Sequence, residues 1–154
     1  SPQNAFYNSI GMETLGLRME RVCDNAKTLA QFFATEYSDI EVNYPGLAGS
    51  KWHNIATEQF GDKFGGIITI RTGNKKRAFG IIDALKLPLI VSNIGDTKTL
   101  VIHPESTLNV HSTQEEKETA GVFDDLIRIS VGIEDIEDLI DDFKQAIESV
   151  KDVY

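Results

Sequence analysis

The chain has 154 residues, a length typical of one domain and sufficient to bury a substantial core. Hydrophobic residues make up 41% of it and charged residues 25%, as in ordinary globular proteins. The net charge of −9 argues against non-specific nucleic-acid binding, which depends on clustered lysine and arginine. No stretch approaches the roughly 18 consecutive apolar residues of a membrane-spanning helix. We therefore expect neither a nucleic-acid nor a membrane partner.

Two features of the sequence concern the redox compartment of the chain and the position at which it begins. Cys23 is the only cysteine, so no intrachain disulfide can form, and a reducing, cytoplasmic setting is expected. The chain begins with Ser1 and Pro2 and has no initiator methionine. We therefore expect it to start at a cleavage site or another boundary inside a longer protein.

The first strong pattern along the chain is helical. Apolar residues recur at steps of four and three, and charged or polar residues occupy the other sides. This pattern predicts a long amphipathic helix over about 5–36. Gly11 and Gly16 are the positions at which it would bend, because glycine weakens helix interiors. The apolar stripe consists of Leu15, Met19, Val22, Ala26, Leu29 and Phe33.

Short strands and helices follow this helix. The predicted strands, marked by alternating or β-branched residues, cover 40–44, 65–72, 89–93, 99–103 and 126–131. The predicted helices cover 52–60, 75–85, about 113–121 and 136–147, the third of them opened by a Thr113–Glu116 capping box. Helices on one face of a largely antiparallel sheet are the economical arrangement of these elements, so we predict an α+β fold. We expect residues 1–154 to form a single domain, with its α+β core over about 40–150.

Arg128 is the residue of this pattern that suggests a function. It stands in the middle of the strand predicted over 126–131, where an arginine must find a partner or solvent. The pattern alone favours an arginine on the open face of a sheet. The alternative is a carboxylate clamp, because a planar guanidinium can hold a carboxylate through two parallel hydrogen bonds. Asn93, predicted to end another strand, could then supply an additional amide donor, and composition does not decide between the two interpretations.

Other chemically capable residues lack the spacing of a known type of site. The three histidines, His53, His103 and His111, have no metal-ligand spacing, so we predict structural, partly exposed histidines and no metal site. Cys23 lies beside the apolar stripe of the first helix, which favours a packed thiol over a catalytic one. The glycine-rich segment 61–66 precedes a strand instead of opening a helix, which favours a turn over a phosphate-binding loop.

Several motifs in chain order resemble one enzyme family. The segment LIRISVGIE at 126–134 is similar to the terminal signature of the Cys/Met-metabolism family of pyridoxal-phosphate (PLP) enzymes. Within that family, SNIGD at 92–96 and TLVIHPEST at 99–107 resemble the O-acetylhomoserine sulfhydrylase branch. The resemblance runs from Ser1 to about Ile147. Three further stretches that fit are SPQNAF at 1–6, ETLGLRMER at 13–21 and NYPGL at 43–47.

The resemblance implies the small C-terminal domain of a homotetrameric fold-type I enzyme, whose PLP is bound to a lysine. In the family, that lysine and the other cofactor-binding groups lie upstream of the region similar to this chain. We therefore expect no catalytic or cofactor-binding residue here, and no cofactor bound to the chain alone. The implied partners are its own N-terminal PLP-binding domain and a small amino-acid substrate. By resemblance, Arg128 binds the substrate α-carboxylate, Asn93 contacts the same carboxylate from the preceding strand, and Ser92 lies beside it.

The implied reaction of the complete enzyme converts O-acetylhomoserine and sulfide or methanethiol into homocysteine or methionine and acetate. Methionine γ-lyase, cystathionine γ-lyase and cystathionine γ-synthase are alternatives within the family, although they more often carry a Ser-Leu-Gly-Gly-like segment at 92–96. A free-standing α+β ligand-binding module is an alternative of another class. Two positions depart from the branch: Leu108-Asn109 replaces a common Thr-His, and Val22 replaces a usual histidine. The first departure affects the expected substrate pocket, so the acyl-donor and thiol preferences stay open.

Overall fold

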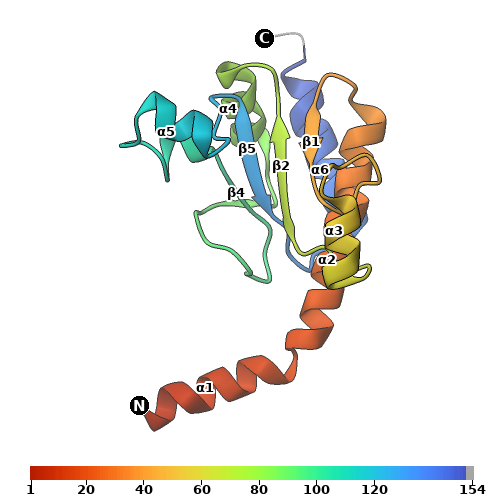
Figure 1. The fold of residues 1–154 in the computed structure, drawn as a ribbon, viewed down its shortest axis with the longest axis vertical. Coiled ribbons are helices and arrows are strands. Elements are labelled where there is room, and N and C mark those ends of the chain that lie inside the picture. The colour runs from red at the N-terminus through yellow and green to blue at the C-terminus, as the bar shows by residue number, and fades with distance from the viewer. Residues whose placement is uncertain (152–154) are drawn as a thin grey trace.

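The computed structural model describes residues 1–151, so the last three residues of the domain predicted over 1–154 lie outside the described residues. Figure 1 shows a sheet seen from its open side, with helices behind it and the first helix projecting away from the body. The helices are α1 (Pro2–Glu13), α2 (Leu15–Glu36), α3 (His53–Phe60), α4 (Lys75–Ala84), α5 (Gln114–Thr119) and α6 (Ile136–Ser149), with a 3-10 turn over Pro104–Ser106. The strands are β1 (Glu41–Asn43), β2 (Ile67–Arg71), β3 (Leu89–Ile90), β4 (Leu100–Ile102) and β5 (Leu126–Ser130).

The five strands form one sheet in the order β1-β2-β5-β4-β3. Neighbouring strands are antiparallel, except β3 and β4, which are parallel. The central strand β5 places Arg128 between Thr69 of β2 and Ile102 of β4. The same cross-strand row continues through Thr69 to Asn43 of β1. Residues directly opposite each other share a face of the sheet, so these four side chains lie on one face.

The opposite face of the sheet carries the hydrophobic core. Ile127 and Ile129, which flank Arg128 in β5, have no exposed surface. Residues of α2, α4 and α6 complete this core, and Phe33 of α2 packs edge-on against Phe143 of α6 with ring centroids 5.3 Å apart. The predicted α+β fold, with helices on one face of a largely antiparallel sheet, is confirmed.

The helix predicted over 5–36 is divided at Thr14 into α1 and α2, and this break lies between Gly11 and Gly16, the two positions at which a bend was expected. Arg18 of α2 stabilises the break. It donates hydrogen bonds to the Thr14 hydroxyl and to the carbonyl oxygen of Gly11, which lies in α1. Residues of the apolar stripe are buried in α2 only from Val22 onward. Helix α1 buries none of its residues, and Phe6 is 62% exposed. The projecting part of the helix therefore gains no stability from the core.

The other predicted elements are present, with changed ends. The strand predicted over 89–93 stops at Ile90, because the Val91 N–H turns back to the carbonyl of Leu89 and leaves the ladder. The prediction that Asn93 ends a strand is therefore wrong. The capping box of α5 is confirmed, since the side chains of Thr113 and Glu116 each accept from the other residue's main-chain N–H. Within residues 1–151, no helix is long and apolar enough to cross a membrane.

Glu105 ties α5 to α4. Its carboxylate lies 2.6 Å from the ammonium group of Lys117 in α5 and 2.8 Å from that of Lys75 in α4. Hydrogen bonds from Lys117 and then Lys75 lower the pKa of Glu105 from its usual 4.5 to about 2. The folded state therefore favours the ionised form of this carboxyl group.

We expect Glu105 to make folding sensitive to acid. A carboxyl group whose pKa falls on folding stabilises the folded state above its unfolded pKa of 4.5, and this contribution is lost as the pH falls toward about 2. Glu105→Gln should therefore flatten the pH dependence of the unfolding free energy in that window, measured by urea denaturation. Glu115→Gln removes an exposed carboxyl group of α5, the helix that Glu105 contacts through Lys117, and is the control. Equal pH dependence in wild type and Glu105→Gln would contradict this role.

Candidate functional site

Arg128 projects from the middle of β5 onto the face of the sheet that the helices leave uncovered. Side chains alternate along a strand, so burial of Ile127 and Ile129 on the helical face places Arg128 on the other. The side chain is half-buried between Thr69 and Ile102 of the neighbouring strands. The predicted position of Arg128 in the middle of a strand is confirmed.

The guanidinium of Arg128 is held by main-chain oxygens. Its Nη2 donates to the carbonyl of Ser92 at 2.8 Å and to that of Asn93 at 3.2 Å. Within residues 1–151, its buried Nε has no hydrogen-bond partner and no carboxylate forms an ion pair with it. Burial lowers the pKa of Arg128, but a guanidinium stays protonated at neutral pH. A charged fork without a counter-ion is suited to a carboxylate ligand.

Ser92 and Asn93 lie beside Arg128, but the contacts differ from the amide donor expected of Asn93. Both residues follow the end of β3 and belong to the loop between β3 and β4. Their carbonyl oxygens accept hydrogen bonds from Nη2 and so orient the guanidinium. The structure therefore brings the three predicted site residues together, two of them through main-chain atoms.

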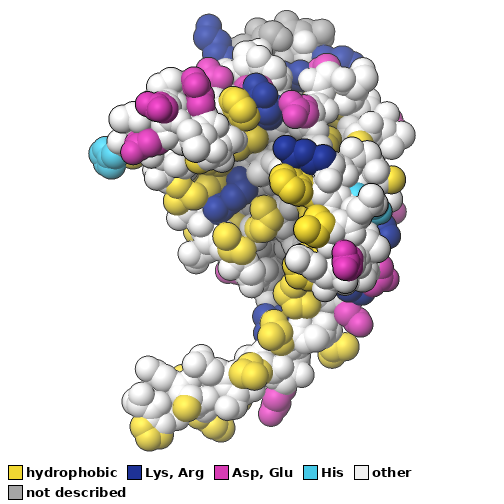
Figure 2. Space-filling view, viewed as in Figure 1, with side chains coloured by type: hydrophobic (Ala, Val, Ile, Leu, Met, Phe, Trp, Pro, Cys, Tyr) yellow, Lys and Arg dark blue, Asp and Glu magenta, His cyan; other side chains and the backbone are white. Residues whose placement is uncertain are grey.

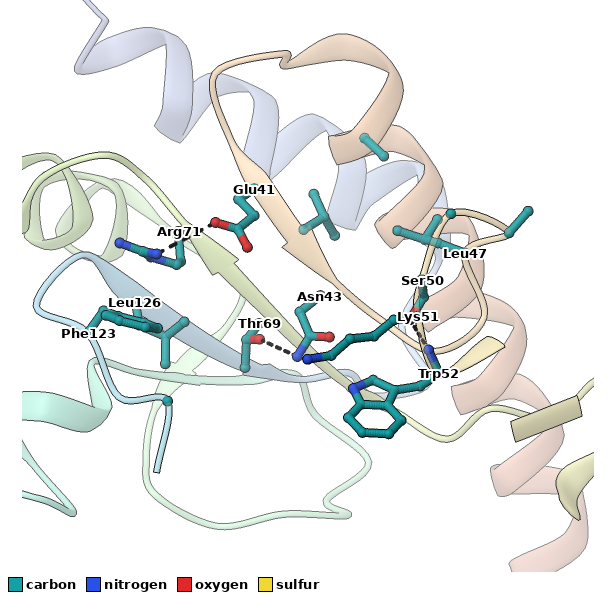
Figure 3. A pocket seen from close by; sticks show the side chains of 15 residues that line it. Glu41, Asn43, Leu47, Ser50, Lys51, Trp52, Thr69, Arg71, Phe123 and Leu126 are labelled. Carbon is teal, nitrogen blue, oxygen red and sulfur yellow. Dashed lines mark hydrogen bonds and ion pairs between the residues drawn. The ribbon is translucent and has the colours of Figure 1, made fainter. Parts of the chain in front are cut away.

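A hollow of about 830 Å³ lies on the same open face, next to the row that contains Arg128. Figure 3 shows Asn43 and Thr69 side by side on its floor, with Trp52 at its edge. The Asn43 amide donates to the Thr69 hydroxyl at 3.3 Å, and Thr69 is the cross-strand neighbour of Arg128. Polar side chains therefore extend from Arg128 across β2 to β1. Alternation predicts that Thr69 faces away from the core, but only the strand register brings it next to Arg128.

Arg71 lines the same hollow but is already paired. Its Nε donates to the buried carboxylate of Asp125 at 2.9 Å, and a second carboxylate, that of Glu41, lies 3.6 Å from Nη1. The ring of Phe123 stacks on the guanidinium at 3.9 Å. The charge of Arg71 is thus compensated inside the chain, unlike that of Arg128. This difference makes Arg128 the stronger candidate for binding an external anion.

Two of the remaining candidates, Cys23 and His103, are buried inside the fold. Cys23 is a free, buried thiol, as predicted. His103 is only 3% exposed, so the prediction of a partly exposed histidine is wrong there; its ring nitrogens contact the Ser106 hydroxyl and the Asp124 carbonyl at 2.9 and 2.8 Å. In the described part of the chain, no group of three or more His, Cys, Asp or Glu could hold a metal ion.

Comparison with known proteins relates the chain to one enzyme family. Residues 1–148 match the family described as Cys/Met metabolism PLP-dependent enzyme. The L-methionine gamma-lyase of Fusobacterium nucleatum subsp. polymorphum is 40% identical, over 97% of this chain and 38% of its own length. A Campylobacter jejuni structure described as an O-acetylhomoserine (thiol)-lyase, with N'-pyridoxyl-lysine-5'-monophosphate, is 40% identical with a TM-score of 0.91, over 96% of this chain and 35% of that one. Yeast cystathionine gamma-lyase is 33% identical with a TM-score of 0.93, over 98% and 39%.

The chain belongs to the Cys/Met-metabolism family of PLP-dependent enzymes. This confirms the family expected from the motifs, and the two structural matches confirm its fold. The chain spans only 35% to 39% of the length of these relatives. Their names give three different activities, so membership of the family does not by itself assign a reaction.

Among the described residues, the hollows on the open face and beside the loop between β3 and β4 offer no clear attachment site for the family's cofactor. Attachment of PLP requires a lysine that is free to form a Schiff base. A second, smaller hollow lies beside the loop between β3 and β4, where Ser130 and segment 94–97 line it. Within residues 1–151, no lysine lines this second hollow. Lys75 and Lys117 are both paired with Glu105, and Lys51, at the larger hollow, lies over the ring of its neighbouring tryptophan. No step through the cofactor is therefore assigned to this chain.

Proposed function

We propose that the chain supplies the substrate-carboxylate wall of a PLP-dependent O-acetylhomoserine sulfhydrylase. The observation that carries the proposal is Arg128: a half-buried guanidinium, fixed in orientation by two carbonyls, with no carboxylate partner in residues 1–151. An α-amino-acid substrate would provide the missing counter-ion. Its carboxylate would also accept hydrogen bonds from guanidinium N–H groups that otherwise stay unpaired. An unpaired buried donor costs about 1–3 kcal/mol.

The proposed reaction converts O-acetylhomoserine and sulfide or methanethiol into homocysteine or methionine and acetate. PLP, held by the remainder of the full-length enzyme, would supply the electron sink for the β,γ-elimination. Arg128 binds and orients the α-carboxylate, and it transfers no proton because a guanidinium keeps its protons at neutral pH. Ser92 and Asn93 keep the guanidinium in place through their carbonyls. Asn43 and Thr69 border the same face and are available to the rest of the substrate.

The choice of the sulfhydrylase branch rests on sequence motifs. SNIGD at 92–96 and TLVIHPEST at 99–107 are similar to that branch, and the first of them contains the carbonyls that hold Arg128. The sibling reactions of methionine γ-lyase, cystathionine γ-lyase and cystathionine γ-synthase need the same carboxylate contact. The contact therefore supports an amino-acid substrate, and the motifs support the acyl-homoserine among such substrates.

We further propose that the chain acts as the C-terminal domain of a homotetrameric, cytoplasmic enzyme, docked on an N-terminal PLP-binding domain of the same polypeptide. Figure 2 shows hydrophobic side chains gathered over the open face of the sheet and along the projecting N-terminal helix. Phe6 and Met12 of α1 and Leu17 of α2 are 62%, 69% and 72% exposed. Apolar surface that is exposed to this extent marks an interaction site, and a covering domain would place its cofactor opposite Arg128.

An assay of the full-length enzyme tests the assignment. O-acetylhomoserine with sulfide should be the preferred substrate pair, measured by kcat/KM against cystathionine and against methionine. The family's fold is common to all these reactions, so only the preference distinguishes them. Faster cleavage of cystathionine or methionine would contradict the sulfhydrylase assignment.

A free-standing ligand-binding module is the second candidate, favoured by the core that α2, α4 and α6 build on the sheet without further chain. The two candidates differ in what precedes Ser1. A gene whose coding sequence continues upstream for at least a domain's length, roughly 100 residues, and includes the cofactor lysine would contradict the module. A coding sequence that starts close to Ser1 would contradict the enzyme domain.

A further inference from the structure

The loop that holds Arg128 is itself anchored by a buried contact at its end. The loop spans 91–98, and Thr99, the residue that directly follows it, has no exposed surface. The carboxylate of Glu134, four residues beyond the end of β5, accepts from both the N–H and the hydroxyl of Thr99, the latter at 2.9 Å. The Thr99 hydroxyl also accepts from the Gly132 N–H at 2.9 Å. One hydroxyl group thus joins the loop to the turn that follows β5.

The turn and the loop are packed without intervening space. A side chain at Gly132 would collide with the Glu134 carboxylate and with the main chain of Thr97. The Thr97 carbonyl accepts from the N–H of Ile133 at 2.9 Å. A displacement of the turn would therefore displace the loop as well.

Helix α2 holds the other side of this turn. Asn25, which is 2% exposed, donates to the carbonyls of Gly132 and Glu134 at 3.1 and 2.9 Å. Arg21 adds a bond to the Glu134 carbonyl at 3.2 Å. Contacts therefore connect α2 to the turn after β5, and the turn to Thr97 and Thr99 at the far end of the loop whose carbonyls contact Arg128.

We propose that Glu134 and Thr99 are positioning residues for Arg128. They fix the loop 91–98, and through it the carbonyls of Ser92 and Asn93, at the place where these orient the guanidinium toward the substrate carboxylate. Neither residue touches the guanidinium; both act through the loop. Small misplacements of a binding group cost much of its effect, because two parallel hydrogen bonds need correct distance and angle together. The inference rests on the proposed function of Arg128.

The segment that directly precedes β3 offers a matched control. Asp142 of α6 is 6% exposed and accepts from the main-chain N–H groups of Lys86 and Leu87, both at 2.9 Å. Strand β3 lies between this contact and the loop, and its pairing with β4 holds the start of the loop independently. Asp142→Asn therefore weakens a buried carboxylate contact of similar kind without releasing the carbonyls at 92 and 93.

The test compares Thr99→Val, Thr99→Ser, Asp142→Asn and Arg128→Ala in the full-length enzyme. Thr99→Val keeps the shape of the side chain and removes the hydroxyl. We expect it to raise the KM for O-acetylhomoserine about ten-fold, the effect of losing one charge-assisted hydrogen bond, with kcat changed less than about three-fold. Amide hydrogen exchange in 91–98 should accelerate. Thr99→Ser should restore both values, and Asp142→Asn should lower Tm without changing either.

An unchanged KM in Thr99→Val, unchanged exchange in 91–98, or an equal effect of Asp142→Asn would overturn the positioning role. Arg128→Ala separates the two possible failures. If it raises KM while Thr99→Val does not, the positioning inference alone is wrong. If Arg128→Ala leaves KM unchanged, the proposed function of the arginine is wrong, and the inference is overturned with it.

Discussion

Arg128→Ala in the full-length enzyme is expected to raise the KM for O-acetylhomoserine about 10- to 100-fold. The variant loses a charge-assisted contact to the substrate carboxylate worth about 1.5–3 kcal/mol. The neighbouring arginine on the open face, Arg71, is already paired with Asp125 and is therefore not free to take over the contact. Steady-state kinetics over a range of O-acetylhomoserine concentrations measures the effect.

Two variants control for this result. Arg128→Lys keeps the charge but loses the planar fork, so its KM should lie between those of wild type and Arg128→Ala. Lys98→Ala removes an exposed cation from the adjoining loop and should leave KM within about two-fold, as surface charges contribute little. Equal KM values for wild type and Arg128→Ala would mean that the arginine is a sheet residue only.

Phe143→Ala should lower the free energy of unfolding by about 3–5 kcal/mol, the usual cost of emptying a buried aromatic site. Phe143 has no exposed surface and stacks edge-on with Phe33 at the junction of α6 and α2. The cavity would open between α2 and α6, two of the helices that cover the sheet. Urea denaturation followed by far-UV circular dichroism measures the loss.

Phe6→Ala provides the contrast, because Phe6 is 62% exposed on a helix that buries none of its residues. Its effect on the chain should stay within about 0.5 kcal/mol. If Phe143→Ala does not fold, Phe143→Leu extends the test, with an expected loss of about 1–2 kcal/mol, since most of the volume is retained. Equal losses at Phe6 and Phe143 would contradict the assignment of the core.

The fold could be predicted to the extent that local periodicity reports it. Alternation along 126–131 predicts both the burial of Ile127 and Ile129 and the outward direction of Arg128. Periodicity did not locate the break at Thr14, because the apolar stripe begins at Leu15 and lies wholly within α2. The bonds from Arg18 to Thr14 and Gly11 that stabilise this break depend on a side-chain conformation, which residue spacing does not specify.

The candidate site was predictable in its residues but not in its contacts. Arg128 follows from a strand pattern and a family motif. The role of Ser92 and Asn93 does not, because it lies in their carbonyl groups, and every residue has one. Thr69 was missed because its proximity to Arg128 arises from the register of β2 against β5, which hydrophobic alternation leaves open.

The most direct test of the account is whether Arg128 acts through the substrate carboxylate. We would measure kcat/KM of the full-length enzyme and of Arg128→Ala with O-acetylhomoserine and with its α-carboxamide, as a double cycle between side chain and substrate. If Arg128 binds the carboxylate, its replacement should lower kcat/KM about 10-fold or more with O-acetylhomoserine and less than about three-fold with the carboxamide. Equal losses with both substrates would show that Arg128 acts elsewhere and would contradict the central claim.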